Sequence, residues 1–213
     1  MEKNNKSKNE INPFLKMDAE TMYWLGYIFA DGNIAYNEKQ RQYSISLFSK
    51  DLDILYKFKE FLGPLSKMYV RNTGIGQVIY RSKSVTKWFI NTFDVGPNKS
   101  LILDPNIELN WDLLHGYFDG DGCIRLTDPH KEAKFTTGSL VWAGRIREFL
   151  LKYNIENKII KKGNAYDVNI YKKDSVKLLY QYMYQNNTSR LEYKYNRFVA
   201  LFDREKFGEL LES

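Results

Sequence analysis

The stretch WLGYIFADG, residues 24–32, reappears in altered form as LHGYFDGDG, residues 114–122. Both contain Gly-Tyr and an apolar residue, then, after one further position, a small residue, Asp and Gly. Asp31 and Asp121 take the same place in the two stretches, and each stretch is long enough for more than two helical turns. A phrase of this length that recurs once predicts that the chain is an internal duplication.

The composition indicates a folded protein with a polyanionic partner. In 213 residues, 43% hydrophobic and 15% aromatic content supports a core, and the net charge of +6 with a pI near 9.1 favours nucleic acid. A single cysteine, Cys123, excludes an internal disulfide framework and fits a reducing, intracellular setting. The sequence has no apolar run of the ~18 residues that a membrane span requires, and its polar start does not read as a secretory signal. Residues 1–17 are expected to be a disordered lead-in.

Hydrophobic periodicity predicts the same order of elements in both halves. Asp18 and Asn110 are each placed to cap the helix that carries the repeated phrase. The first half is expected over 18–100 and the second over 108–213, giving an α+β fold. The expected helices are 19–30, 51–63, 84–93, 111–120, 139–155 and 175–184, and the expected strands are 41–49, 66–72, 77–82, 134–138, 157–163 and 165–173.

Small residues four apart mark one face of each repeated helix. Gly26 and Ala30 in the first copy, and Gly116 and Gly120 in the second, allow two helix backbones to approach closely. A single such helix reads as an ordinary buried helix with tight packing points. Two at matching positions predict that the copies pack against each other through these helices.

The two acids break a local rule in both copies. Asp31 and Asp121 lie in the last turn of their helices, where the negative end of the helix dipole disfavours a carboxylate. If the helices pack in parallel, the carboxylates also repel each other. A divalent cation such as Mg²⁺ or Mn²⁺ would compensate, since it prefers oxygen ligands and activates water for phosphodiester hydrolysis. The alternative is that Asp-Gly is a common turn dipeptide.

The two stretches resemble the paired motifs of the LAGLIDADG homing endonucleases, here in one chain. The matching residues are Gly26, Ile28, Ala30, Asp31 and Gly32 in the first copy, and Gly116, Asp119, Asp121 and Gly122 in the second.

The resemblance implies a pseudo-symmetric monomer of two αββαββα halves, with antiparallel sheets forming a saddle on double-stranded DNA and the motif helices at the central interface. It implies an active endonuclease that cuts both strands at a long site and needs no protein partner. Asp31 and Asp121 would bind the divalent metal together with the backbone carbonyls of Ala30 and Gly120. Phe29 departs from the family pattern, at a position that is not a metal ligand. A phage, bacterial or organellar gene would be ordinary for the family.

Family members also carry basic or polar groups around the active site, at the junctions between strands and helices. The matching positions in the first half are Ser49, Lys50 and Lys83, and in the second Gly138, Ser139, Lys172 and Lys173. Lys83 and Lys173 are the predicted catalytic lysines, which would stabilise negative charge on the scissile phosphate. They fit solvated surface lysines equally well.

Alternation along the strands predicts a face that reads DNA in the major groove. If Tyr43, Ile45 and Leu47 face the core, the intervening residues face the groove. The tail segment 190–198 is basic and aromatic, and would either track phosphate or pack as a helix on the second half. The groove-facing candidates from alternation are Ser44, Ser46, Lys67, Tyr69, Arg71, Asp167, Asn169 and Tyr171, and the further basic candidates are Arg41, Arg81, Arg125, Lys134, Lys158, Lys161 and Lys162.

Two other functions stay open at this point. The same fold could bind nucleic acid without cutting it, as an intron maturase or a regulator, or the chain could be a two-domain interaction protein whose Asp-Gly dipeptides only end helices. A splicing intein fits poorly, since the only histidines are His115 and His130 and the sequence ends LLES. One cysteine and two histidines exclude a structural zinc site.

Overall fold

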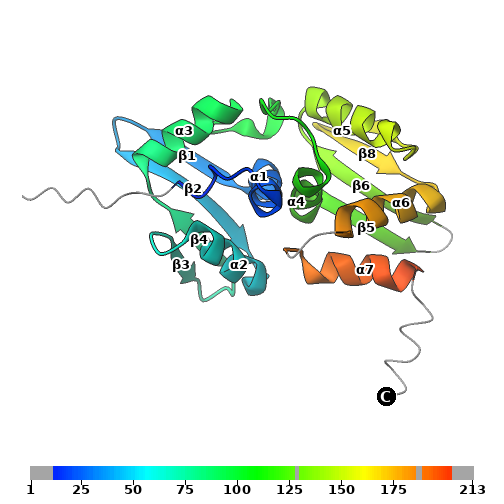
Figure 1. Cartoon of the computed structure of the whole chain (residues 1–213), viewed down its shortest axis with the longest axis horizontal. Coiled ribbons are helices and arrows are strands. Elements are labelled where there is room, and N and C mark those ends of the chain that lie inside the picture. Colours follow the sequence, from blue (N-terminus) through cyan, green and yellow to red (C-terminus); the bar gives the residue numbers. More distant parts are fainter. Residues whose placement is uncertain (1–11, 128–129, 186–188, 203–213) are drawn as a thin grey trace, which may run out of the picture.

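The computed structural model describes residues 12–127, 130–185 and 189–202, and divides them into two similar halves. Each half runs helix, two strands, helix, two strands, helix, so the expected α+β architecture of two αββαββα halves is confirmed (Figure 1). The first half comprises α1 (Ala19–Asp31), β1 (Asn33–Asn37), β2 (Gln42–Ser49), α2 (Leu52–Leu62), β3 (Lys67–Val70), β4 (Gly76–Tyr80) and α3 (Lys83–Phe93). After the 3-10 helix η1 (Lys99–Leu101), the second comprises α4 (Trp111–Asp121), β5 (Gly122–Thr127), β6 (His130–Thr137), α5 (Leu140–Lys152), β7 (Lys158–Lys162), β8 (Ala165–Ile170) and α6 (Lys173–Tyr184), followed by α7 (Glu192–Phe202).

The two sheets have the same topology. Their strand orders are β1-β2-β4-β3 and β5-β6-β8-β7, and every pairing is antiparallel. Helices cover one face of each sheet, where apolar side chains such as Ile45, Val78, Phe135 and Val168 are fully buried. The opposite face, called the free face below, carries the alternate side chains of each strand.

The motif helices begin where the sequence predicts. The Asp18 carboxylate accepts a hydrogen bond from the Thr21 backbone N–H at 2.9 Å, and the Asn110 side chain accepts one from the Leu113 N–H, also at 2.9 Å. Each cap satisfies a backbone donor that the first helical turn leaves without a partner. The two copies therefore start their central helices by the same device.

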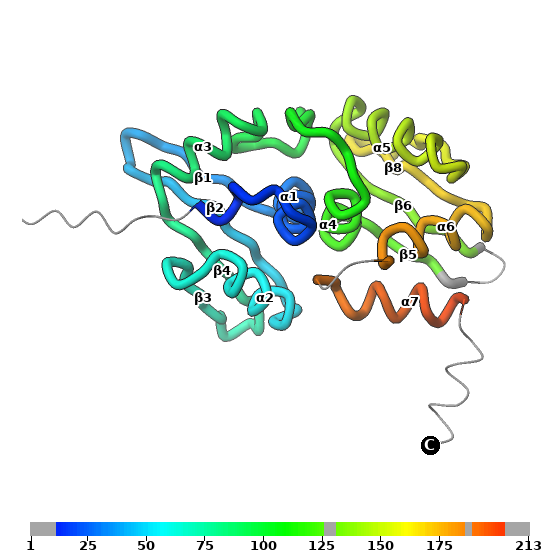
Figure 2. Tube along the Cα trace, viewed as in Figure 1, coloured from blue at the N-terminus to red at the C-terminus, as the bar shows by residue number. Residues whose placement is uncertain are grey.

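The two motif helices α1 and α4 lie side by side at the centre of the molecule, one from each half (Figure 2). A Cβ built on Gly26 would lie 1.9 Å from the Leu113 carbonyl oxygen, and one on Gly116 only 1.8 Å from the Tyr23 oxygen. These are backbone atoms of the opposite helix, so no side chain larger than hydrogen fits at either position. The predicted contact through small residues is present.

Three expectations about the elements need correction. Strands β1 and β5 were not predicted from the periodicity. β1 is short and polar, and it is identified by its pairing with β2. The disordered lead-in is wrong for residues 12–17, since Phe14 is fully buried and packs edge-on against Phe61 and Phe89 at 5.5 and 5.3 Å between ring centroids. Residues 1–11 lie outside the described residues.

Among the helices described, none is both long and apolar enough to cross a membrane.

Candidate functional site

The structure brings Asp31 and Asp121 together at the adjoining C-terminal ends of α1 and α4. A Cβ built on Gly120 would lie 2.4 Å from the Ala30 Cβ and 3.6 Å from the Asp31 Cβ, so the helices touch at the residues next to the acids. Neither helix has a basic residue in its last turn. Two carboxylates therefore share the negative ends of two helix dipoles, as the repeated phrase predicts.

Both carboxyl groups hold their protons more tightly than free aspartate does. Burial raises the pKa of Asp31 above its ordinary value, against the opposing attraction of Lys99 and Lys194. Burial, and then the negative charge of Asp31, raise the pKa of Asp121 to about 6. Because one acid raises the pKa of the other, the two act as a single electrostatic centre.

Two buried lysines complete this centre, and neither was predicted. The Lys99 ammonium donates to the Ala30 carbonyl oxygen at 3.2 Å. The Lys194 ammonium, 3% exposed, donates to the carbonyl oxygens of Phe118 at 2.7 Å, Asp119 at 2.8 Å and Gly120 at 3.4 Å. Each lysine therefore binds the carbonyl of the residue just before a motif acid.

Burial also lowers the pKa values of the two lysines. It lowers the pKa of Lys99 below its ordinary value, and it lowers the pKa of Lys194 to about 8, in each case against the attraction of the nearby acids. The sequence offered no signal for either residue. Lys99 lay outside the expected helices and strands and Lys194 in the tail segment 190–198. Their bonded carbonyls are 69 to 76 residues away in the chain.

The raised pKa of Asp121 predicts how stability depends on pH. Its folded pKa of about 6 exceeds the ordinary 3.8, so its contribution to stability is complete below pH ~4 and is lost as the pH rises through 6. Asp121→Asn should therefore stabilise the metal-free protein at pH 7.5 by roughly 1 kcal/mol after solvent screening, about 2–4 °C in Tm. Thermal unfolding from pH 4 to 8 measures this. The difference between the two proteins should vanish at pH 4, and a constant difference across the range would contradict the assignment.

Three of the lysines predicted at the strand-to-helix junctions, Lys83, Lys172 and Lys173, make their contacts away from Asp31 and Asp121. Lys83 forms an ion pair with Glu38 at 2.9 Å and lies over the Tyr43 ring, at the turn between β1 and β2. Lys172 pairs with Glu156, and Lys173 is the exposed first residue of α6. Within the described residues, no hydrogen bond or ion pair links any of these three to the two acids. The geometry thus does not support the predicted catalytic role of Lys83 and Lys173.

The free face of the first sheet carries the predicted alternation. Strand pairing sets Lys67 opposite Ile79 and Tyr69 opposite Gln77, and it sets Ser46 opposite Ile79 as well, so these residues share one face. Ser44 and Ser46 are nevertheless buried, at 8% and 1% exposure. The exposed members of this region are Arg41, Lys50, Lys67, Tyr69, Arg71 and Arg81.

The free face of the second sheet carries paired charges. Lys134 and Lys162 contact the Asp167 carboxylate at 2.8 and 3.1 Å, and Arg125 contacts Glu132 at 3.5 Å. Register also places Asn169 there, opposite Lys134 and Lys158, and Tyr171 is exposed beyond the end of β8. This face presents donors and acceptors together.

Three predicted DNA-binding residues need correction here. Lys161 pairs with Tyr166, on the same face as Val168, so it lies on the helix side of the sheet. Ser139 is 3% exposed and accepts a hydrogen bond from the Trp142 N–H as the cap of α5. Ser49 is half-buried and likewise serves its own backbone, accepting from the Asp51 N–H.

The donor set at the two acids suits a hard divalent cation. Among the described residues, no group of three or more His, Cys, Asp or Glu side chains gathers, so the protein offers two carboxylates and backbone carbonyls rather than a complete cage. Mg²⁺ is usually held in this way, by one or two carboxylates with water and phosphate oxygens. Burial keeps the pKa values of both carboxyl groups raised despite the attraction of Lys99 and Lys194.

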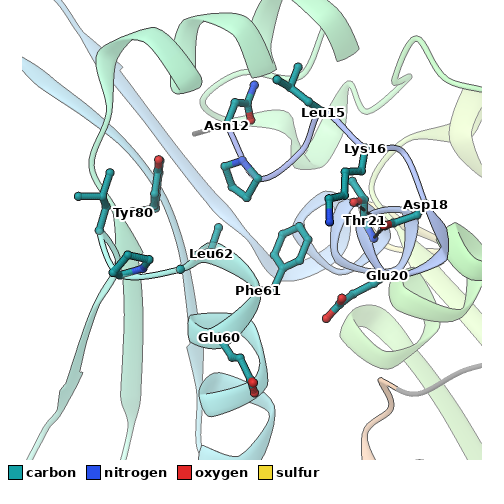
Figure 3. A pocket seen from close by; sticks show the side chains of 14 residues that line it. Asn12, Leu15, Lys16, Asp18, Glu20, Thr21, Glu60, Phe61, Leu62 and Tyr80 are labelled. Atoms are coloured by element: carbon teal, nitrogen blue, oxygen red, sulfur yellow. Dashed lines mark hydrogen bonds between the residues drawn. The ribbon is translucent and has the colours of Figure 1, made fainter. Parts of the chain in front are cut away.

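A separate cavity of about 970 Å³ lies at the other end of α1 (Figure 3). Its lining includes Leu15, Asp18, Thr21, Phe61 and Leu65, around the start of α1 and the end of α2. Since α1 has 13 residues, the cavity is separated from Asp31 by most of a helix about 20 Å long. It takes no part in the acidic centre.

Comparisons with known proteins agree with this architecture. The LAGLIDADG-like domain family model matches residues 18–93 and again residues 109–184. A curated relative, the DNA-directed RNA polymerase subunit Rpo1C of Methanocaldococcus jannaschii, is 28% identical over 162 residues. That alignment covers 68% of this chain, which spans only 18% of the length of the relative.

Three solved structures share the fold. The homing endonuclease I-WcaI bound to its DNA recognition sequence has a TM-score of 0.60 and 16% identity, covering 83% of this chain and 85% of that one. I-DmoI in complex with DNA and Mn has a TM-score of 0.55 and 17% identity, covering 81% and 98%. The N-terminal LAGLIDADG domain of DUF199/WhiA has a TM-score of 0.53 and 14% identity, covering 91% of each chain.

Proposed function

Because the chain belongs to the LAGLIDADG family, we propose that it is a site-specific endonuclease that hydrolyses one phosphodiester bond in each strand of a DNA duplex. The observation that carries the proposal is the meeting of Asp31 and Asp121 at the paired helix ends, with the Lys99 and Lys194 ammonium groups on the adjoining carbonyls. Each half supplies one acid and one lysine. A centre with two such sets suits the two cuts that open a duplex.

Asp31 and Asp121 would hold Mg²⁺ or Mn²⁺, with the carbonyls of Ala30 and Gly120 as further oxygen ligands. The bound cation supplies charge stabilisation and an activated water for hydrolysis. A carbonyl oxygen has two lone pairs, so Ala30 and Gly120 can accept from a lysine and still offer an electron pair. Support for the metal comes from the carboxylates themselves and from the I-DmoI neighbour, which is described with DNA and Mn.

Lys99 and Lys194 have two effects in this proposal. They offset the negative charge of the two acids and the two helix ends, which would otherwise repel a phosphate. They also place positive charge in a site that is partly shielded from water. There, the negative charge that develops on the scissile phosphate is stabilised more strongly than in water. This assigns to them the role that the family resemblance implied for Lys83 and Lys173.

The free faces of the two sheets are the proposed DNA contact surface. Their polar and basic side chains fit combined contacts to base edges and to phosphates. Two sheets side by side fit a long, asymmetric site, because their free faces carry different residues. The chain would bind it as a monomer without a protein partner, inside the cell or organelle that holds the target DNA.

Selection from a randomised duplex library tests the function. The protein is incubated with the library and Mg²⁺, and newly formed ends are sequenced from both strands. The expected result is paired cuts at one long site, lost when the metal is chelated and regained with Mn²⁺. Uncut DNA in every metal would contradict the nuclease.

A second candidate is a module that binds DNA or RNA without cutting it. The observation in its favour is that the N-terminal LAGLIDADG domain of DUF199/WhiA shares this fold, so the fold also occurs outside the proteins named as homing endonucleases. A selection in which the protein retains one sequence tightly, with no new ends in Mg²⁺ or Mn²⁺, would establish this candidate instead.

A further inference from the structure

Asp119 ties together three helices that are far apart in the sequence. Its side chain is 1% exposed and lies in α4, two residues before Asp121. Its Oδ2 accepts a hydrogen bond from the Tyr23 hydroxyl of α1 at 2.8 Å and another from the Leu191 backbone N–H at 2.7 Å. Leu191 directly precedes α7, so this carboxylate fixes the point at which α7 begins.

The position of α7 decides where Lys194 lies. Lys194 is in the first turn of α7, three residues after Leu191, and its backbone N–H donates to the Leu191 carbonyl. Its ammonium spans the last carbonyls of α4, including that of Asp119 itself. Asp119 thus holds the same short segment twice, by its side chain at Leu191 and by its backbone at Lys194.

Further along α7, the fully buried Phe198 packs against the rings of Phe118, Tyr180 and Tyr184, so the role of Asp119 concerns the start of the helix. Near that start, the other polar contacts are longer or partly exposed. Lys57 of the first half lies 3.9 Å from Glu192 and donates to the Arg190 carbonyl at 3.4 Å, while Arg197 donates to the Ile124 carbonyl at 3.0 Å. The Lys57 and Glu192 side chains are partly open to solvent, where such pairs contribute little. The buried bonds to Asp119 are the short ones at the start of the helix.

The first half places its lysine by other means. Phe29 stands two residues before Asp31, where the second half has Asp119, and it packs against the Phe89 and Phe93 rings. Lys99 comes from the 3-10 helix η1 and reaches the Ala30 carbonyl from there. Equivalent cations are therefore held by unlike supports in the two halves.

We propose that Asp119 is a positioning residue: it fixes the start of α7 and so places Lys194 beside Asp121, and without it the two strand cuts become unequal. The inference rests on the proposed nuclease function for its second part only. Asp119 does not need to touch metal or DNA, since its side chain is buried between helices. The strand whose phosphate lies on the Lys194 side should be cut more slowly, and the other at nearly its normal rate.

The first test needs neither DNA nor metal. Hydrogen exchange of the Leu191 amide is compared in the wild type, Asp119→Leu and Asp119→Asn. Asp119→Leu removes both acceptor oxygens at similar volume, so exchange should accelerate about tenfold or more. Asp119→Asn keeps one acceptor oxygen and should stay close to the wild type. Glu192→Gln is the matched control, because it changes the same end of α7 without touching Asp119. Unchanged exchange in Asp119→Leu would overturn the inference.

The second test resolves the two strands. With each strand labelled on the selected site, Asp119→Leu should accumulate nicked duplex, with one strand slowed about tenfold or more and DNA affinity unchanged. Asp119→Asn should restore the balance, which it would not do if the carboxylate bound metal. Equal slowing of both strands would overturn the positioning role.

If Asp119→Leu fails to fold, Lys194→Met, with Asp119 intact, should slow the same single strand. Equal slowing of both strands in Lys194→Met would again overturn the positioning role. A wild type that cuts neither strand would refute the proposed function, while the exchange result would still decide how α7 is held.

Discussion

Asp31→Asn and Asp121→Asn should each reduce Mg²⁺-dependent DNA cleavage by about 10³-fold or more, the largest effect expected of any single substitution in this chain. The two carboxylates are the only charged oxygen ligands that the motif helices bring to the centre among the described residues. Asparagine keeps the shape but removes the charge that holds the cation. Because the acids act as one centre, the double variant should be scarcely worse than either single one.

Cleavage rate and DNA affinity should respond in opposite directions. Removing a carboxylate from a site that faces phosphate lowers repulsion, so metal-free binding of the target should stay equal or become tighter. Single-turnover cleavage with Mg²⁺ and binding without metal measure the two quantities. Asp174→Asn, an exposed acid in the first turn of α6, is the control and should change neither. Full cleavage by either motif variant would exclude its acid as a metal ligand.

Alanine at Gly26 or Gly116 should destabilise the fold by about 4 kcal/mol or more, a fall in Tm on the order of 10 °C for a chain of this size. The added Cβ would lie 1.9 Å from the Leu113 oxygen or 1.8 Å from the Tyr23 oxygen. Both are backbone atoms within a helix, so they cannot rotate away. The helices must separate, and separation also pulls apart the two acids at their ends.

Gly144→Ala is the matched control for this prediction. Gly144 lies inside α5, and a Cβ there meets nothing within 4 Å. Because alanine favours helix over glycine, this variant should be stabilised by about 0.5–1 kcal/mol. Thermal and denaturant unfolding of the three variants gives the comparison. If alanine at Gly26 were tolerated as well as at Gly144, the central contact of α1 and α4 would be wrong.

Local patterns predicted most helices and six of the eight described strands, because each is specified by neighbours within one or two turns. The caps at Asp18 and Asn110, and the helix end at Gly63 with a φ of 76°, all lie where the periodicity places them. The periodicity did not predict β1, because a short polar strand is recognised only from its pairing with a neighbouring strand. Ser139 was misassigned because the same side chain that could contact DNA caps its own helix instead.

The sequence by itself determined the duplication, the central helix pair and the two acids. Glycine spacing and the paired Asp-Gly ends are local features that repeat, and a repeat can be read without knowing what lies across the interface. Only the tertiary structure decided which cations join the acids. Lys99 and Lys194 contact carbonyls roughly 70 residues away, and Asp119 receives its hydrogen bonds from residues 96 and 72 positions distant. Such contacts leave no periodic trace in the chain, because they arise when separate helices pack and each buried charge must find an oppositely charged or hydrogen-bonding group.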